Sequence, residues 1–270
     1  MLHQQQPAIS LFSIGMIGLG LASVISRDFA FGWQPVPPFH PGRGALALSC
    51  GLFMIAVSVA LLFRATATLA SQLMLPFLLA WLGLMLPAVI AAPRIEGVWG
   101  GFGEIGMLLA GGWVLFARLS EFERFGFLAG DSGIRVAQII FGVSVIPVGL
   151  GHIFYVAITA SLVPTWLPFR VALAYLTGIA QIACGLGILF RVFARAAALC
   201  ETVMLALFAF LVWGPNTWFS VAPKLAGTPS GPRFPLTAFF ITWVIGASAW
   251  LIGNNSGAEA VGCLRSSQGG

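Results

Sequence analysis

Eight apolar runs, each about 20 residues long, constrain what this chain can fold into. They cover roughly residues 8–26, 44–63, 67–90, 99–118, 134–157, 171–190, 194–213 and 235–253. A helix needs about 20 mainly apolar residues to cross the hydrocarbon core of a bilayer. Since no water in that core can satisfy the backbone, only helices and closed barrels can span it. The runs therefore predict an all-α fold, a polytopic bundle of eight transmembrane helices.

Composition excludes several other classes of protein. Charged residues make up 8% of the 270 positions and apolar residues 59%, too few polar groups to cover a soluble domain. The net charge of +5 is small and dispersed, so we expect membrane lipid and no nucleic acid as a partner. No cysteine or histidine cluster has metal spacing, so no metal site is expected. The four cysteines are Cys50, Cys184, Cys200 and Cys263.

Two of these cysteines fall at similar depths on helices expected to be antiparallel neighbours. Cys184 comes about six residues before the end of one run, and Cys200 about six residues after the start of the next. At about 1.5 Å per residue their heights match, which leaves a dithiol open. The other interpretation is that both are inert small hydrophobic residues.

The chain contains an internal repeat. The segment VPPFHPGR at 36–43 returns as VPTWLPFR at 163–170, and residues 36–64 match residues 163–191 at 13 of 29 positions without a gap. The matches include two prolines, two arginines and a glycine in register, which shared hydrophobicity does not explain. We expect two four-helix repeats, residues 1–130 and 131–270. Because four is an even number, both would enter the membrane from the same side, as parallel repeats.

Five residues are candidates for a ligand or proton site. Arg43 and Arg170 end the repeated segment, where each can reach lipid headgroups or an anion. Glu104, Glu201 and His152 lie inside apolar runs, where an ionisable side chain costs about 2.5–3.5 kcal/mol and is by default a functional candidate.

Each of the three intramembrane candidates also has a structural interpretation. Glu104, about six residues inside the fourth run, can be an interfacial acid paired with an arginine. Glu201 can accept a hydrogen bond from Gln181 or pair with Arg195. His152 can relay protons, or it can hydrogen-bond a neighbouring helix.

The second half of the chain resembles the DoxX-like family of small bacterial membrane proteins. The resemblance rests on the turn VPTWLP, the sequence YLTG at 175–178, the sequence GLGIL at 185–189, and the arginine turn with its alanines at 191–198. The first half is similar in DFAFGWQPVPPFHPGR and in WGGFGEIGMLLAGG, which includes Glu104. The usual family member is a single four-helix unit, whereas this chain looks like two fused units.

The resemblance implies a function but no catalytic residues. Some DoxX-like proteins are membrane subunits of quinone-linked redox enzymes, which implies a non-catalytic subunit or anchor of such an assembly, with a soluble oxidoreductase as partner. A quinone cofactor is implied by the resemblance alone, and the chain is not expected to be an enzyme by itself. We place it in the bacterial inner membrane with both termini in the cytoplasm. Two alternatives stay open: a small-molecule or lipid permease with a proton-titrating acid at the repeat seam, and a purely structural membrane protein.

Overall fold

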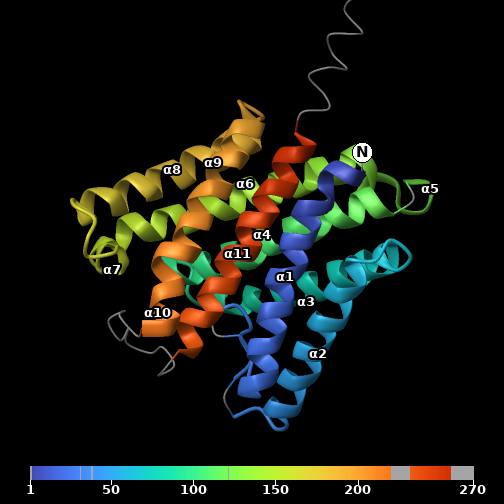
Figure 1. Cartoon of the computed structure of the whole chain (residues 1–270), viewed down its shortest axis with the longest axis horizontal. Helices are drawn as coiled ribbons and strands as arrows, with labels where there is room; N and C mark the ends of the chain where they lie inside the picture. Colours follow the sequence, from blue (N-terminus) through green and yellow to red (C-terminus); the bar gives the residue numbers. More distant parts are fainter. Residues whose placement is uncertain (1, 31, 38, 121, 220–231, 257–270) are drawn as a thin grey trace, which may run out of the picture.

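The chain forms a bundle of long helices in a computed structural model that describes residues 2–30, 32–37, 39–120, 122–219 and 232–256 (Figure 1). Within these ranges there is no β-strand. The helices are α1 (Leu2–Ser26), α2 (Arg43–Leu61), α3 (Ala67–Ala91), α4 (Glu96–Leu119), α5 (Phe122–Phe125), α6 (Gly130–Phe154), α7 (Val156–Leu162), α8 (Arg170–Phe190), α9 (Ala194–Leu207), α10 (Gly214–Phe219) and α11 (Arg233–Asn255). A short 3₁₀ helix, η1 (Gly126–Leu128), and a π-helix, η2 (Phe208–Trp213), complete the chain order.

The prediction of eight membrane-spanning helices is confirmed at the level of length and composition. Eight helical stretches of the described chain are long and apolar enough to cross a membrane, and α9, η2 and α10 together form the seventh. Four expected boundaries were wrong by three or four residues: both ends of the fifth span, which starts at Gly130, the start of the fourth, and the end of the seventh, which is at Thr217. The fifth span ends at Phe154 rather than near residue 157, because Tyr155 leaves the helical conformation with φ −108° and ψ 39°. The fourth span starts at Glu96, three residues earlier than expected.

Burial separates inner spans from outer ones. In the most apolar part of α4, 72% of the residues are buried inside the protein, against 22% in the span that includes α9. Large apolar side chains on the outer spans face outward instead, for example Leu176 and Phe190 on α8. Such broad apolar exposure is incompatible with water and typical of a surface covered by lipid. The helices therefore indicate a membrane-lipid environment.

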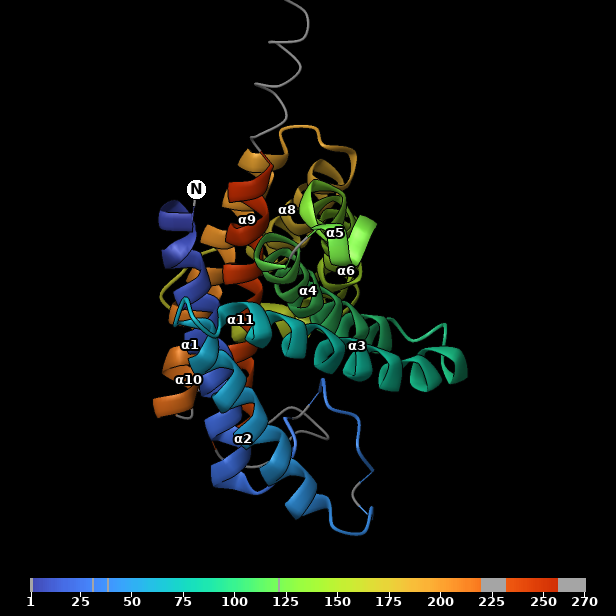
Figure 2. The same ribbon diagram turned by 90° about the vertical axis from the view of Figure 1, so that its right-hand side faces the viewer.

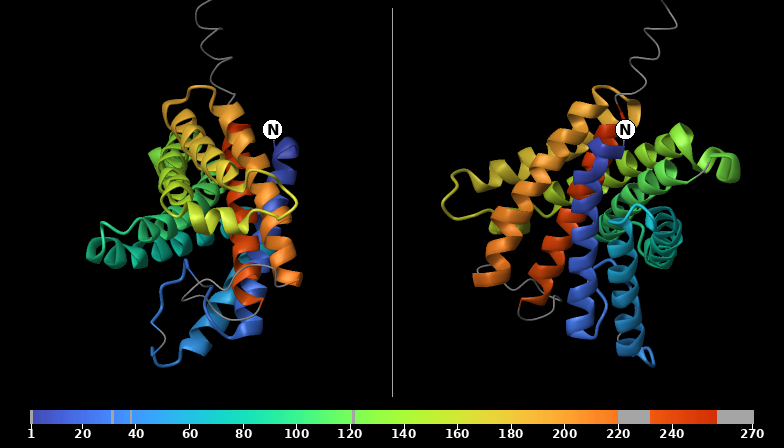
Figure 3. Two further views of the ribbon diagram at one scale, coloured as in Figure 1. Left: turned by 90° about the vertical axis from the view of Figure 1, so that its left-hand side faces the viewer. Right: turned by 45° about the vertical axis from the view of Figure 1, so that its right-hand side comes forward.

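The two most central helices, α4 and α11, organise the bundle. Helix α11 packs on α1, α9 and α4, and α4 packs on α3, α6 and α11. The pairs α2/α3 and α8/α9 lie on opposite sides of this centre (Figure 3). The helices do not all run in one direction, since α3 lies across the direction of α1 and α11 (Figure 2).

Glycine pairs allow two helix crossings to come close at the backbone. In the α1–α2 crossing, a Cβ on Gly51 would lie 2.8 Å from the carbonyl oxygen of Gly20. In the α6–α8 crossing, a Cβ on Gly149 would lie 2.8 Å from the carbonyl oxygen of Gly178. Real Cβ atoms do not approach so closely, so a larger side chain would push each pair of helices apart. Small residues at such crossings are the usual means of packing helices in lipid.

The central helices α4 and α11 meet at two levels in matching register. A Cβ on Gly111 would collide with the Ser248 side chain, and the Nε of Arg118 donates a hydrogen bond of 2.7 Å to Oδ1 of Asn255. Both contacts join residues 137 positions apart. A constant separation along two contacting helices means that the helices run in the same direction.

The repeated segment forms the same turn in both places. The backbone N–H of His40 donates to the carbonyl oxygen of Pro37 at 3.1 Å, and the N–H of Leu167 donates to that of Pro164 at 3.0 Å. Pro164 corresponds to Pro37, and Leu167 to His40, at the same offset as the two copies of the segment in the sequence. The structure of Pro38 lies outside the described residues.

In both copies the turn leads into the next helix through the same backbone conformation. Gly42 and Phe169, which precede the two arginines, both adopt the left-handed conformation, with φ of 72° and 54°. This conformation costs a phenylalanine about 1–2 kcal/mol. The geometry of the turn, rather than the preference of the residue, therefore imposes it. Arg43 and Arg170 are then the first residues of α2 and α8.

An ion-pair network attaches the first of these turns to the last helix. Both carboxylate oxygens of Asp28 are used: Arg43 approaches Oδ1 at 2.6 Å, and Arg233 approaches Oδ2 at 2.9 Å. Arg233 also donates to the carbonyl oxygen of Phe29 at 2.7 Å, and Arg43 donates to that of Val36. The segment between α1 and α2 is therefore fastened to the start of α11.

The network changes the acidity of Asp28, which lies outside the spans. Partial burial raises the pKa of its carboxyl group, but the N–H of Phe29 and the charges of Arg233 and Arg43 lower it by more. The net pKa lies below the ordinary value of 3.8. A carboxylate whose pKa is lowered in the folded state stabilises that state above its unfolded pKa and loses the effect as the pH falls through the folded value.

Asp28→Asn is expected to lower the midpoint of thermal unfolding in detergent. The variant loses two charge-assisted interactions of a partly buried group, which corresponds to about 1–3 kcal/mol. The matched control is Asp131→Asn, because Asp131 pairs with Arg118 at 3.1 Å but is 72% exposed. Wild type and Asp28→Asn should differ at pH 7 and converge as the pH falls from 3.8 through the lower pKa of the folded state. Equal midpoints for wild type and Asp28→Asn at pH 7 would show that the network is not stabilising.

Candidate functional site

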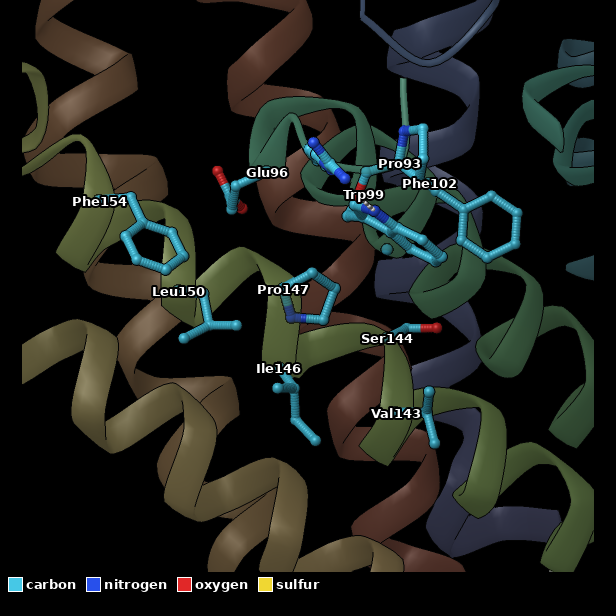
Figure 4. Close-up of a pocket in the computed structure, with 12 residues that line it drawn as sticks. Pro93, Glu96, Trp99, Phe102, Val143, Ser144, Ile146, Pro147, Leu150 and Phe154 are labelled. Carbon is cyan, nitrogen blue, oxygen red and sulfur yellow. Dashed lines mark hydrogen bonds between the residues drawn. The ribbon is translucent and has the colours of Figure 1, made fainter. Parts of the chain in front are cut away.

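The larger of two pockets at the end of α6 lies between α4 and α6 and has a volume of about 490 Å³ (Figure 4). It is lined mainly by apolar side chains together with one acid and one base. The lining residues are Pro93, Arg94, Glu96, Trp99, Phe102, Gly103, Val143, Ser144, Ile146, Pro147, Leu150 and Phe154. Apolar walls with a few convergent polar groups are the usual composition of a ligand site.

Glu96 supplies the acid of this pocket. It is the first residue of α4, and its Oε1 would lie 3.2 Å from a Cβ on Gly151, so the absence of a side chain on α6 makes room for the carboxylate. Oε1 is buried and has no hydrogen-bond partner among the described residues. Figure 4 shows Glu96 on the side of the pocket next to Phe154. A buried acceptor without a donor is costly, and a ligand donor would remove that cost.

Aromatic side chains are fixed beside this carboxylate. The indole N–H of Trp99 donates to the carbonyl oxygen of Pro93 at 2.9 Å, and the Trp99 ring meets that of Phe102 edge to face at 6.2 Å. On the α6 side, the hydroxyl of Tyr155 accepts a hydrogen bond of 3.3 Å from the N–H of Gly97. These contacts hold the start of α4 against the end of α6.

A second pocket, of about 250 Å³, lies on the other side of the end of α6. It is enclosed by the turn VPTWLP of the second repeat, by α7 and α8, and by the π-helix η2. The lining residues are His152, Thr159, Leu162, Val163, Pro164, Leu167, Leu173, Thr177, Leu207, Phe208, Leu211, Val212 and Trp213. A π-helical turn inside a longer helix is often found at a functional site, and here it contributes Phe208, Leu211, Val212 and Trp213 to the lining.

His152 is held in this pocket by two contacts. Its Nδ1 lies 2.9 Å from Oγ1 of Thr177, and its ring lies against that of Phe208 with centroids 5.6 Å apart. In the arrangement in which the Thr177 hydroxyl donates its only hydrogen to the carbonyl oxygen of Ala174, 3.0 Å away, it accepts from Nδ1. Nε2 of the neutral ring is then an acceptor, and no described residue donates to it. The predicted hydrogen bond to a neighbouring helix is present, and Nε2 is still available to a ligand.

Glu201 lies in a separate cluster between α8 and α9. Its side chain is fully buried, and its Oε1 is 3.4 Å from Nε2 of Gln181, which is the predicted partner. Oε2 of Glu201 and Oε1 of Gln181 have no partner among the described residues. Cys184 neighbours both Glu201 and Cys200. The predicted proximity of the two cysteines is thus found in the structure, whereas Cys263 lies outside the described residues.

Glu104 lies deeper than the sequence predicted. Because α4 begins at Glu96, Glu104 follows two helical turns inside the helix, where it is partly buried. Among the described residues it forms no hydrogen bond or ion pair, and the expected pairing with an arginine is absent there. It lines neither of the two pockets.

The two arginines of the repeated segment have different surroundings. Arg43 binds Asp28, whereas Arg170 is exposed and has no hydrogen bond or ion pair with any described residue. At the offset between the two copies of the repeated segment, the residue that corresponds to Asp28 is Tyr155, which has no negative charge. Neither arginine lines the two pockets, so the five candidates do not meet in one site.

Residues Cys184 and Cys200 should form a disulfide when the membrane-embedded protein is treated with a copper–phenanthroline oxidant. Gly187 and Ala197, one helical turn away on the same two helices, are in close contact, so the antiparallel helices bring the two thiols to the same height. The measurement is the mass of the linked peptides, with Cys50 as the internal control because it lies on α2. Unlinked Cys184 and Cys200 under conditions that oxidise a surface thiol would contradict the packing of α8 on α9.

Comparison with known proteins gives a match to one family. The model of a domain of unknown function (DUF8561) matches residues 141–248, less than half of the chain. No curated protein and no solved structure matches. All residues that line the His152 pocket fall inside the matched segment, whereas Arg94, Glu96 and Trp99 of the larger pocket precede it.

Proposed function

We propose that this chain is the membrane subunit of a quinone-linked redox assembly and that the His152 pocket binds the reduced quinone. The observation that carries the proposal is an apolar pocket containing one imidazole nitrogen that is free to accept a hydrogen bond. A quinol has a flat apolar ring and two hydroxyl donors, and Nε2 is a suitable acceptor for one of them. The resemblance to DoxX-like proteins supports the same class of function.

The proposal includes the repeat architecture. We infer two four-helix units, residues 1–130 and 131–270, which run in the same direction through a bacterial inner membrane with both termini in the cytoplasm. Three observations support it: the identical turns of the repeated segment, the glycine crossings of α1–α2 and α6–α8, and the matching register of α4 and α11. Only the second unit has a histidine at this position, because the residue 127 positions before His152 is Ile25.

In this function the chain binds and positions the quinol, and its soluble partner carries out the redox reaction. The apolar side chains of Leu162, Leu167 and Leu211 line the pocket, which suits a ligand that arrives from the bilayer. The hydrogen bond from Nδ1 to Thr177 keeps the ring in the tautomer that presents Nε2 as an acceptor. A soluble oxidoreductase is the expected partner of such a subunit.

His152→Leu is expected to weaken the binding of a short-chain ubiquinol to the purified protein by about tenfold, the effect of losing one well-placed hydrogen bond. Binding is measured by the quenching of tryptophan fluorescence, since Trp213 lines the pocket. The control is His40→Leu, in an exposed turn. Thr177→Val should cause a smaller loss, because it releases the imidazole without removing it. Failure of the wild type to bind ubiquinol, or equal binding by His152→Leu, would refute this assignment.

A permease is the second candidate, and it is favoured by Glu104, which is partly buried and has no partner among the described residues. Glu104→Gln should abolish any proton-coupled uptake into proteoliposomes if Glu104 carries the proton, while leaving ubiquinol binding intact. Unchanged uptake by the variant would remove Glu104 from such a mechanism. Absence of both ubiquinol binding and uptake in the wild type would leave a purely structural role.

A further inference from the structure

The larger pocket, between α4 and α6, is located where membrane spans end. Helix α3 ends at Ala91, α4 begins at Glu96, and α6 ends at Phe154, so the pocket lies among three span termini. In a bilayer this is the level of the lipid headgroups, where aromatic side chains also collect. Trp99 and Phe154 are 39% and 64% exposed there, toward the medium that surrounds the spans.

Two opposite charges face this pocket without neutralising each other. Glu96 and Arg94 both line it, yet the described residues form no ion pair between them and offer neither one a partner through its charged group. The buried oxygen of Glu96 is costly without a partner, whereas Arg94 is exposed at the same pocket and adds a positive charge. A ligand with a complementary pair of charges satisfies both groups. A zwitterion is such a ligand, with a cation for Glu96 and an anion for Arg94.

The acid indicates which cation fits. Oε1 of Glu96 is buried and lacks a hydrogen-bond donor, so the cation has to supply an N–H. A primary ammonium has three N–H donors, whereas a quaternary ammonium has none. The aromatic rings of Trp99 and Phe154 add cation–π attraction. The guanidinium of Arg94 suits a phosphate, which it can bind through two parallel hydrogen bonds.

The rest of the pocket is apolar. Val143, Ile146 and Leu150 continue from the charged end along α6, and Val143 is 52% exposed on the outside of the bundle. Figure 4 shows these three residues following one another along α6, away from Glu96. An acyl chain lying there would cover apolar surface while the headgroup stays at the span termini.

We propose that this pocket is a binding site for phosphatidylethanolamine, with the ammonium on Glu96, the phosphate on Arg94 and one acyl chain along α6. The site is independent of the His152 pocket, which lies on the other side of the end of α6. It makes the chain a selective lipid binder as well as a quinol binder.

The test reconstitutes the full chain in nanodiscs with equal parts of phosphatidylethanolamine, phosphatidylcholine and phosphatidylglycerol of matched acyl chains. The lipids retained after extraction into detergent are identified by native mass spectrometry. The wild type should retain phosphatidylethanolamine at least about fivefold over the other two, and Glu96→Gln should lose the preference over phosphatidylcholine. Arg94→Gln should reduce retention of all three phospholipids, since each has the phosphate. The controls are Asp131→Asn and Arg64→Gln, which replace charges outside the pocket.

Three outcomes would overturn the proposal. The wild type retains the three lipids equally, it retains phosphatidylglycerol in preference to phosphatidylethanolamine, or Glu96→Gln keeps the selectivity of the wild type. A thermal midpoint and a ubiquinol dissociation constant equal to those of the wild type show that each variant is folded. Because ubiquinol binding does not use Glu96, failure of the lipid proposal and failure of the quinol proposal are distinguishable.

Discussion

Close approach of helix backbones at small residues is the contact on which the rest of this structure depends. Lipid gives helices no hydrophobic reason to associate, so van der Waals contact and a few hydrogen bonds have to hold them. The crossings at Gly20 with Gly51, at Gly149 with Gly178, and at Gly111 with Ser248 provide that contact. The α6–α8 crossing, together with the close contact of Gly103 on α4 with Ser144 on α6, fixes α6 between α4 and α8, and both pockets are formed around that helix.

The end of α6 connects the two proposed sites. Gly151 leaves room for the carboxylate of Glu96 on one side, and His152 reaches Thr177 on the other. The helix then breaks at Tyr155, whose hydroxyl contacts the start of α4. One short segment thus contributes to a zwitterion site and to a quinol site. A movement of this segment would alter both sites together, although no residue is shared between their linings.

The sequence predicted the spans well because hydropathy reports directly on the lipid environment. It missed the larger pocket because Glu96 lies outside the apolar run and meets α6 only after folding. The break at Tyr155 was missed since the apolar pattern continues through it. Repeat symmetry predicted equal roles for Arg43 and Arg170, but the acid that binds Arg43 has no counterpart near Arg170. The Gln181–Glu201 contact was predictable, because two polar side chains at similar depth on adjacent helices satisfy each other.

The ion pair between Asp28 and Arg233 has a consequence for biosynthesis. Arg233 also bonds Phe29, 204 residues earlier in the chain, and α11 covers the inner face of α1. At about 5–20 residues per second, a ribosome needs about 10–40 s to make the intervening chain. Throughout that interval the carboxylate of Asp28 has only one of its two arginine partners, Arg43, and one side of α1 is uncovered. The uncovered side of α1 is therefore a surface that an insertase or chaperone would have to shield until α11 is made.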